Sequence, residues 1–170
     1  MEKLCIVSGE KVWTLSVDVR IFDSGGSLPD AVALAVSAAI SDVILPNVSI
    51  LGSEDEGVQA IEVDPNPSNG THLCEALLPL CVTVYKAGNS FVVDATMEET
   101  LCTQAQISVA VSQSGKVGGI QKRASGGIST ADMEQMIDIA IASAKSLFAQ
   151  VKSLIDNKPQ HSSLPIGFIF

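Results

Sequence analysis

Residues 13–42, WTLSVDVRIFDSGGSLPDAVALAVSAAISD, join two different hydrophobic patterns across a Gly-Gly pair. Apolar and polar side chains alternate almost without a break from Val12 to Ile21, which is typical of a strand with one buried face. The apolar face of this strand would carry Trp13, Leu15, Val17, Val19 and Ile21. We therefore expect a half-buried strand over residues 12–21.

The second half of the same stretch predicts a helix over residues 28–41. Ser27 can cap the first turn, Pro29 is tolerated there, and Asp30 adds a favourable negative charge at the helix start. Apolar side chains surround this helix on almost every side, so we expect it to lie buried against a sheet.

Downstream of this helix the sequence predicts more strands and a second, longer helix. The predicted strands are residues 45–51, an edge strand at 58–63, a hairpin of 80–86 with 90–96, and a hairpin of 107–113 with 116–122. Gly88-Asn89 and Ser114-Gly115 supply the turn residues of the two hairpins. The long helix begins at Ser129 or Thr130. Its apolar stripe is Met133, Met136, Ile137, Ala140, Ala144, Leu147, Phe148, Val151, Leu154 and Ile155.

Composition limits the classes of protein that fit. The chain has 170 residues and is 46% hydrophobic, which suits one α+β domain with its own core. We place that domain at residues 1–157 and a tail at residues 158–170. Ten basic residues against 19 acidic ones give a formal charge of −9. Because such a surface repels a polyanion, strong autonomous binding of RNA or DNA is not expected.

Cysteine spacing and hydropathy point to an intracellular protein. Cys5, Cys74, Cys81 and Cys102 form no C-x-x-C pair, so we expect four buried, reduced thiols and no metal site. The start of the chain lacks a secretion signal, and no uncharged stretch reaches the roughly 18 residues of a membrane span. His72 and His161 stand alone and are expected at the surface.

Two blocks, WTLSVDVRIFDSGGSLPDA and VVDATMEE, together with the order of the predicted elements, resemble the RNase PH-like family. Within that family the chain is similar to the non-catalytic ring subunits of the eukaryotic RNA exosome, over about residues 4–156. The resemblance implies an RNase PH-like (ribosomal protein S5 domain 2-like) fold with a mixed sheet and packed helices. Members of the family carry further strands upstream, so the chain corresponds to the C-terminal part of the fold.

The resemblance also implies where a phosphate ion would bind in an active relative. The Gly-Thr-Arg type of loop in active members falls on Ser27, Leu28 and Pro29, and the acidic pair falls on Thr100 and Gln106. Proline offers neither a guanidinium nor an N–H, and loss of one such donor costs about 3 kcal/mol of transition-state stabilisation. We therefore expect degenerate phosphate-site positions, no catalytic residue and no cofactor.

Three other groups of residues are candidate sites. Asp94, Glu98 and Glu99 precede a predicted strand, and we interpret them as structural or solvated, with Asp94 capping a turn. Lys116, Lys122 and Arg123 form a local basic cluster that could touch RNA in an assembled ring, although such residues on a hairpin are more often a solvated edge. The segment Ser125-Gly126-Gly127 precedes a helix and could hold phosphate, although such glycines are more often conformational.

The resulting hypothesis is a catalytically silent structural subunit of the exosome core, found in the nucleus, the nucleolus and the cytoplasm. Its expected partners are other RNase PH-like ring subunits and cap subunits, with RNA contacted only inside the assembly and no membrane. One alternative is a phosphorolytic 3′-to-5′ exoribonuclease that is active only with a paired subunit. Another is a short form that does not assemble at all.

Overall fold

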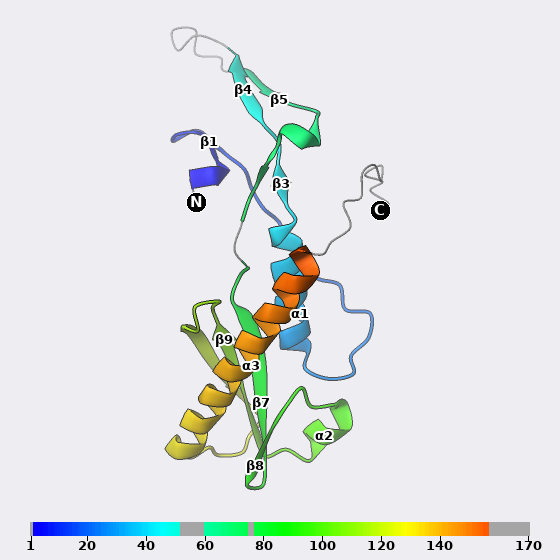
Figure 1. Ribbon diagram of the computed structural model, residues 1–170, viewed down its shortest axis with the longest axis vertical. Helices are drawn as coiled ribbons and strands as arrows, with labels where there is room; N and C mark the ends of the chain where they lie inside the picture. The colour runs from blue at the N-terminus through cyan, green and yellow to red at the C-terminus, as the bar shows by residue number, and fades with distance from the viewer. Residues whose placement is uncertain (1, 52–59, 75–76, 157–170) are drawn as a thin grey trace.

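The structure is a computed structural model that describes residues 2–51, 60–74 and 77–156. The molecule is elongated, with the main sheet and one long helix towards one end, a second long helix near the middle and small hairpins towards the other end (Figure 1). A mixed α+β architecture is therefore confirmed. The predicted tail at residues 158–170 lies outside the described residues.

The sheet is antiparallel and has the order β10-β9-β7-β8. Its strands are β7 (Leu80–Ala87), β8 (Ser90–Val93), β9 (Ala105–Val111) and β10 (Val117–Arg123). Gly88 and Gly115 sit in the two turns with φ of 60° and 82°, a conformation that side chains other than glycine rarely adopt. Both predicted hairpins are confirmed.

The core lies between the sheet and α3 (Thr130–Asp156). Val84, Ile107 and Val109 project from the sheet against Met136 and Ala140 of α3, and all five are fully buried. Helix α3 begins where predicted, because the Ser129 hydroxyl accepts the Asp132 N–H at 3.1 Å. In the predicted stripe, however, Met133, Leu154 and Ile155 are exposed. The sheet covers a smaller part of α3 than the apolar spacing predicts.

Helix α1 (Leu28–Ser41) has the predicted bounds and contacts β7. Thr83 of β7 points towards α1, whereas its neighbours Val82 and Val84 face α3, as alternation along a strand requires. Only Ser37 of α1 is buried. The helix therefore lies against the sheet as expected, but apart from Ser37 its side chains are half-buried or exposed among the described residues.

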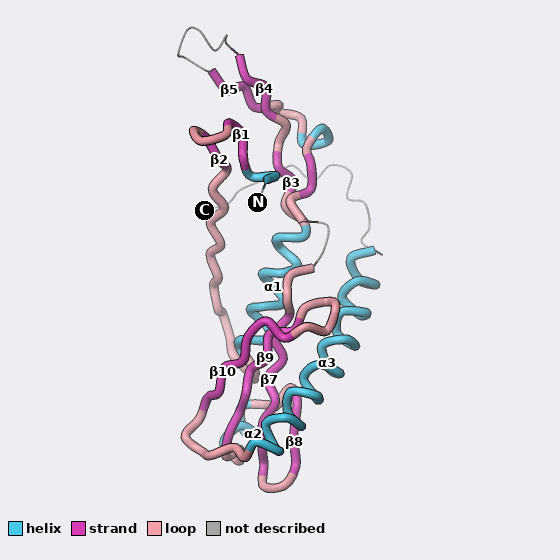
Figure 2. The backbone as a smooth tube through the Cα atoms, turned by 90° about the vertical axis from the view of Figure 1, so that its left-hand side faces the viewer, coloured by secondary structure: helices cyan, strands magenta, loops and turns pink. Residues whose placement is uncertain are grey.

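The predicted strand over residues 12–21 is also wrong. A short strand, β2 (Lys11–Val12), pairs with β1 (Cys5–Val7) after a 3₁₀ turn at Glu2–Leu4, and regular structure then stops until α1. The segment runs alone along the molecule (Figure 2). A strand needs a neighbour for its N–H and C=O groups, and the described residues provide none here.

Small paired strands fill the other end of the molecule. The predicted strand at 45–51 is split into β3 (Ile44–Leu45) and β4 (Val48–Leu51) around Pro46. The predicted edge strand is present as β5 (Ala60–Val63), which pairs with β4. The sequence missed β6 (Thr71–His72), which pairs with β3, and a 3₁₀ turn at Pro67–Asn69 precedes it.

The four cysteines are free thiols, but the expectation that all are buried is wrong. Cys5 and Cys102 are exposed, and Cys74 and Cys81 are half-buried. Cys5 belongs to a two-stranded hairpin and Cys102 to the end of a five-residue helix, and neither element is covered. His72 is exposed as predicted, and His161 lies outside the described residues.

Two methionines of α3 test which side of the helix carries the core. Met136→Ala should lower the free energy of unfolding by about 3 kcal/mol, because it leaves a cavity beneath the sheet. Met133→Ala, with the same chemistry on the exposed side, should change it by less than about 1 kcal/mol. Urea unfolding monitored by circular dichroism measures both, and equal losses would contradict the orientation of α3.

Candidate functional site

The predicted phosphate-site positions, which are up to 79 residues apart in the sequence, line one hollow of about 270 Å³. Its walls are the start of α1, the short helix α2 (Met97–Leu101) and the face of the sheet opposite α3. The positions that meet there are Ser27, Leu28, Pro29, Thr100 and Gln106. Arg123, predicted separately as an RNA contact, lines the same hollow.

A chain of hydrogen bonds fixes the start of α1 on the sheet. The Asp30 carboxylate accepts the Thr83 N–H and the Thr83 hydroxyl, both at 2.8 Å. The Thr83 hydroxyl has then used its proton, so it accepts the Ser108 hydroxyl at 2.8 Å. Bonds to an ionised carboxylate are stronger than neutral ones, and these hold α1, β7 and β9 in one arrangement.

Ser27 occupies the N-cap position of α1, yet its side chain makes no capping hydrogen bond. Its Oγ is buried without a hydrogen-bond partner among the described residues. The predicted Ser27 cap is therefore wrong, because the backbone geometry is that of a cap but the hydroxyl points elsewhere. The sequence identifies the position correctly and cannot give the side-chain rotamer.

Helix α2 on the opposite wall is held by a capping box. Thr96 Oγ1 accepts the Glu99 N–H at 3.3 Å, and the Glu99 carboxylate accepts the Thr96 N–H at 2.8 Å. Glu98 is exposed in the first turn, where its charge favours the helix. The prediction that Glu99 has a structural role is thus supported. The pattern Thr-x-x-Glu could have predicted α2 from the sequence.

Asp94 lies at the turn between β8 and α2 and has φ of 58°, which few residues other than glycine adopt. No side-chain cap by Asp94 occurs among the described residues, so the predicted role is not supported. The turn instead packs against the loop before α1. A Cβ at Gly26 would lie 2.9 Å from the Ala95 carbonyl oxygen, and the Met97 N–H donates to the Gly25 carbonyl.

The hollow offers few groups that could hold an anion. Pro29 has no N–H, the Thr100 hydroxyl donates to the Thr96 carbonyl at 2.8 Å, and Leu28 is apolar. Arg123 is the cation among the residues that line it, and its guanidinium donates to Gln121 Oε1 at 3.3 Å. No carboxylate is found among these lining residues. Arg123 and the Ser27 hydroxyl are thus donors in the hollow, whereas Leu28, Pro29 and Thr100 supply no free donor to an anion.

The basic residues near the second hairpin are not a single cluster. Lys116 precedes β10, whereas Lys122 and Arg123 end it, and successive strand residues point to opposite faces. Lys122 donates to the Ala124 carbonyl at 2.7 Å. Lys86, across the sheet, forms an ion pair with Asp132, and this bond, together with Ser129, holds the pKa of Asp132 below its ordinary value of 3.8.

The loop at Ser125-Gly126-Gly127 has a packing explanation. A Cβ at Gly126 would come within 2.0 Å of the Gln104 carbonyl oxygen, and the Gly126 N–H donates to that oxygen at 3.1 Å. Only glycine permits this approach. The structure supports the conformational interpretation of these glycines over a phosphate site.

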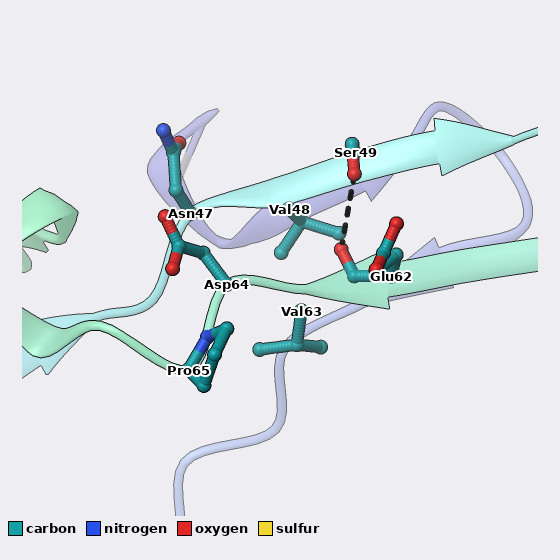
Figure 3. Close-up of a pocket in the computed structure, with 7 residues that line it drawn as sticks. All are labelled: Asn47, Val48, Ser49, Glu62, Val63, Asp64 and Pro65. Carbon is teal, nitrogen blue, oxygen red and sulfur yellow. Dashed lines mark hydrogen bonds between the residues drawn. The ribbon is translucent and has the colours of Figure 1, made fainter.

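Two further hollows lack catalytic chemistry. Figure 3 shows one in the β4–β5 hairpin, where the Ser49 hydroxyl donates to the Glu62 carbonyl at 3.5 Å. Its Asp64 carboxylate accepts hydrogen bonds from the Asn69 side chain and the Asn66 N–H, and these bonds lower the pKa of Asp64.

The second of these hollows has a volume of about 520 Å³ and lies between α1, α3 and β7. Burial, and then the charge of Asp30, raise the pKa of its Cys81 thiol to about 11, so this cysteine is a poor nucleophile.

Within the described residues, no three His, Cys, Asp or Glu side chains gather as metal ligands would. The same part of the chain contains no helix that is both long and apolar enough to span a membrane.

Comparisons with known proteins agree with the resemblance seen in the sequence. Residues 78–143 match the model of the 3′ exoribonuclease family, domain 2. A solved structure titled archaeal exosome core superposes with a TM-score of 0.66 at 26% identity, covering 89% of this chain and 55% of that one. Residues 78–143 therefore resemble domain 2 of the 3′ exoribonuclease family, and the described part of the chain has the RNase PH-like fold.

Its similar curated relatives are exosome components of the Rrp42 type. The putative exosome complex exonuclease RRP42 of Dictyostelium discoideum is 37% identical over 135 residues, which are 79% of this chain and 41% of that protein. The exosome complex component Rrp42 of Sulfurisphaera tokodaii is 33% identical over 156 residues, which are 92% of this chain and 54% of that protein. The chain thus spans about half the length of these relatives, and the resemblance inferred from its motifs is confirmed.

The two N-cap serines give matched tests of the local geometry. Ser129→Ala should cost about 1 kcal/mol of unfolding free energy, because it removes a hydroxyl that accepts the Asp132 N–H. Ser27→Ala should cost nothing or stabilise the protein, because it removes a buried hydroxyl that has no partner among the described residues. Chemical denaturation of the two variants distinguishes them. A loss at Ser27 as large as that at Ser129 would show that Ser27 does cap α1.

Proposed function

We propose that the chain is a catalytically silent structural subunit of an RNA exosome ring, which supports 3′-to-5′ RNA processing and degradation by assembly and RNA channelling. Its homologues carry the name of exosome complex component. The proposal that the subunit is catalytically silent rests on the residues of the hollow beneath α1. At the five positions that the resemblance assigns to the phosphate loop and the acidic pair, it contains a proline, a leucine and three uncharged polar side chains.

The partners in this proposal are other RNase PH-like ring subunits and cap subunits. A net charge of −9 disfavours RNA binding by the isolated chain, so RNA would be contacted only where neighbouring subunits supply basic surface. Lys116, Lys122 and Arg123 remain candidates for such contacts. A ring of this kind would work in the nucleus, the nucleolus and the cytoplasm.

Arg123 favours a second candidate function, a phosphorolytic exoribonuclease whose remaining groups come from a paired subunit. The guanidinium lines the hollow beside Gln106, its cross-strand partner, so one cation is already in place. Catalysis by this route would need the paired subunit to supply both the missing donors and an acid.

Co-expression with RNase PH-like ring subunits tests both functions. We expect the chain to co-purify in a stable complex, and RNA with inorganic phosphate to release no nucleoside diphosphate that depends on the hollow of this chain. The informative variant is Arg123→Ala, with Lys152→Ala on the exposed side of α3 as the charge-matched control.

Three results are distinguishable in this experiment. Equal release from the wild-type complex and from both variants supports a silent subunit. Release that is lost in Arg123→Ala but kept in Lys152→Ala would establish the second function instead. Failure to co-purify with any ring subunit would remove the structural role.

A further inference from the structure

Two asparagines in the turn between β5 and β6 have neighbours that give them opposite chemistry. Asn66 is followed by Pro67, whereas Asn69 and Gly70 form the only Asn-Gly pair in the sequence. Asparagine is a thermolabile residue, and it deamidates when the nitrogen of the next residue attacks its side-chain carbonyl carbon. Proline has no N–H and cannot react in this way, whereas glycine has no Cβ to hinder the approach. The sequence therefore favours deamidation at Asn69 and prevents it at Asn66.

The reaction at Asn69 needs water as its only other reactant. The Gly70 nitrogen loses its proton and bonds to Asn69 Cγ, the bond from Cγ to the side-chain nitrogen breaks, and ammonia leaves with that proton. The succinimide ring that results takes up one water molecule, which opens the ring at one carbonyl or the other. The products are aspartate and isoaspartate, and both replace a neutral amide with a carboxylate.

In the folded chain, the amide group of Asn69 is hydrogen-bonded to a carboxylate. Asn69 Nδ2 donates to Asp64 Oδ2 at 2.7 Å, and Asp64 Oδ1 accepts the Asn66 N–H at 2.8 Å. An ionised carboxylate can only accept, so the Asn69 atom that faces it is the nitrogen. The bond from Asn69 is the largest of the causes that lower the pKa of Asp64. The two side chains therefore stabilise each other in this arrangement.

The backbone around Asn69 adds a second restraint. Residues Pro67–Asn69 form a 3₁₀ turn, and the Asn69 N–H donates to the Asn66 carbonyl at 3.1 Å. Asp64 lies at the end of β5 beside Asn47, whose carbonyl accepts the Asp64 N–H at 2.9 Å (Figure 3). In a helical turn a side chain leans towards the N-terminus, away from the nitrogen of the next residue. Ring closure thus requires Asn69 to leave this conformation and break its bond to Asp64.

We propose that Asn69 is a site of spontaneous deamidation, which its hydrogen bond to Asp64 slows in the folded chain. After conversion, the donor is lost and two carboxylates face each other, so the turn no longer closes in the same way. The inference goes beyond the proposed function, since it concerns a covalent change among the small hairpins, towards the end of the molecule away from the hollow beneath α1 (Figure 1).

Conversion also affects the strand pair that follows the turn. Gly70 leads into β6, where Thr71 pairs with Leu45 of β3, and the Leu73 N–H donates to the Val43 carbonyl at 3.0 Å. Isoaspartate adds a methylene to the backbone directly before this pair, and either product adds a negative charge. The pairing of β6 with β3 is therefore weaker after conversion.

Peptide mapping by mass spectrometry, after incubation at neutral and mildly alkaline pH, measures the rate at each asparagine. In urea, where the turn is lost, Asn69 should convert faster than any other asparagine, and equally fast in the wild type and in Asp64→Ala. In the folded wild type, Asn69 should convert roughly tenfold more slowly than in urea, because a charge-assisted bond must break first. Asp64→Ala should remove most of this protection.

Two further variants separate the Asp64 bond from general loosening. Asn66→Ala removes the side-chain acceptor of the Ser68 N–H but keeps the bond between Asn69 and Asp64, so its folded-state rate should stay near that of the wild type. Asp64→Asn keeps the size of the side chain and one acceptor oxygen, and it should convert at a rate between those of the wild type and Asp64→Ala. Circular dichroism checks that each variant folds.

Three results would overturn the proposal. Slow conversion of Asn69 in urea would show that it is not a deamidation site. Folded-state rates that do not rise in either Asp64 variant would show that the bond gives no protection. A rate in Asn66→Ala as high as that in Asp64→Ala would assign the protection to the turn as a whole.

The effect of conversion is tested with Asn69→Asp and with Asn66→Asp as the matched control. Asn69→Asp removes the donor to Asp64, whereas Asn66→Asp keeps an oxygen that can accept the Ser68 N–H. Hydrogen exchange of the Leu73 amide should be several-fold faster in Asn69→Asp and close to the wild-type rate in Asn66→Asp. Equal exchange in the two variants would contradict the inferred effect on β6.

Discussion

The carboxylate of Asp30 is the constraint on which the arrangement of this molecule depends. It accepts two hydrogen bonds from Thr83, one from the backbone and one from the side chain, and Thr83 in turn accepts a bond from Ser108. Thr83 and Ser108 are buried in the sheet, on the face opposite the hydrophobic core. A charged group in that position is retained only where its bonds are satisfied, so the start of α1 is fixed in one position.

That placement determines what the hollow beneath α1 can do. With α1 fixed on β7, Pro29 and Leu28 face Thr100 of α2 and Gln106 of β9 across a small space lined mainly by apolar side chains. The same geometry in a protein with a guanidinium and carboxylates at those positions would bring cation, acid and helix N-terminus together. Here the positions that the family resemblance assigns to phosphate and to acids carry neither a guanidinium nor a carboxylate, which is the physical basis for proposing an architectural role.

Sequence patterns over short stretches predicted the elements that are determined by interactions between residues close in sequence. Both hairpins, α1 and the start of α3 follow from turn residues, caps and periodicity close in sequence. The prediction of a strand at 12–21 was wrong because strand formation depends on a neighbour. The predicted burial of Met133, Leu154 and Ile155 was wrong because burial depends on how far the sheet extends. The residues that line the hollow were predicted from the resemblance to a family. Neither hydrophobic periodicity nor residue spacing would have predicted that Pro29 and Gln106 line the same hollow.

Titration of the isotope-labelled chain with inorganic phosphate, followed by NMR, tests the central claim directly. The account predicts that the amide signals of Leu28, Thr100 and Gln106 shift little and without saturation, because the positions that would hold phosphate in an active relative carry no cationic side chain. A saturable shift of these three signals at millimolar phosphate or below, lost on Arg123→Ala, would show that the site still binds the ion and would contradict a silent subunit.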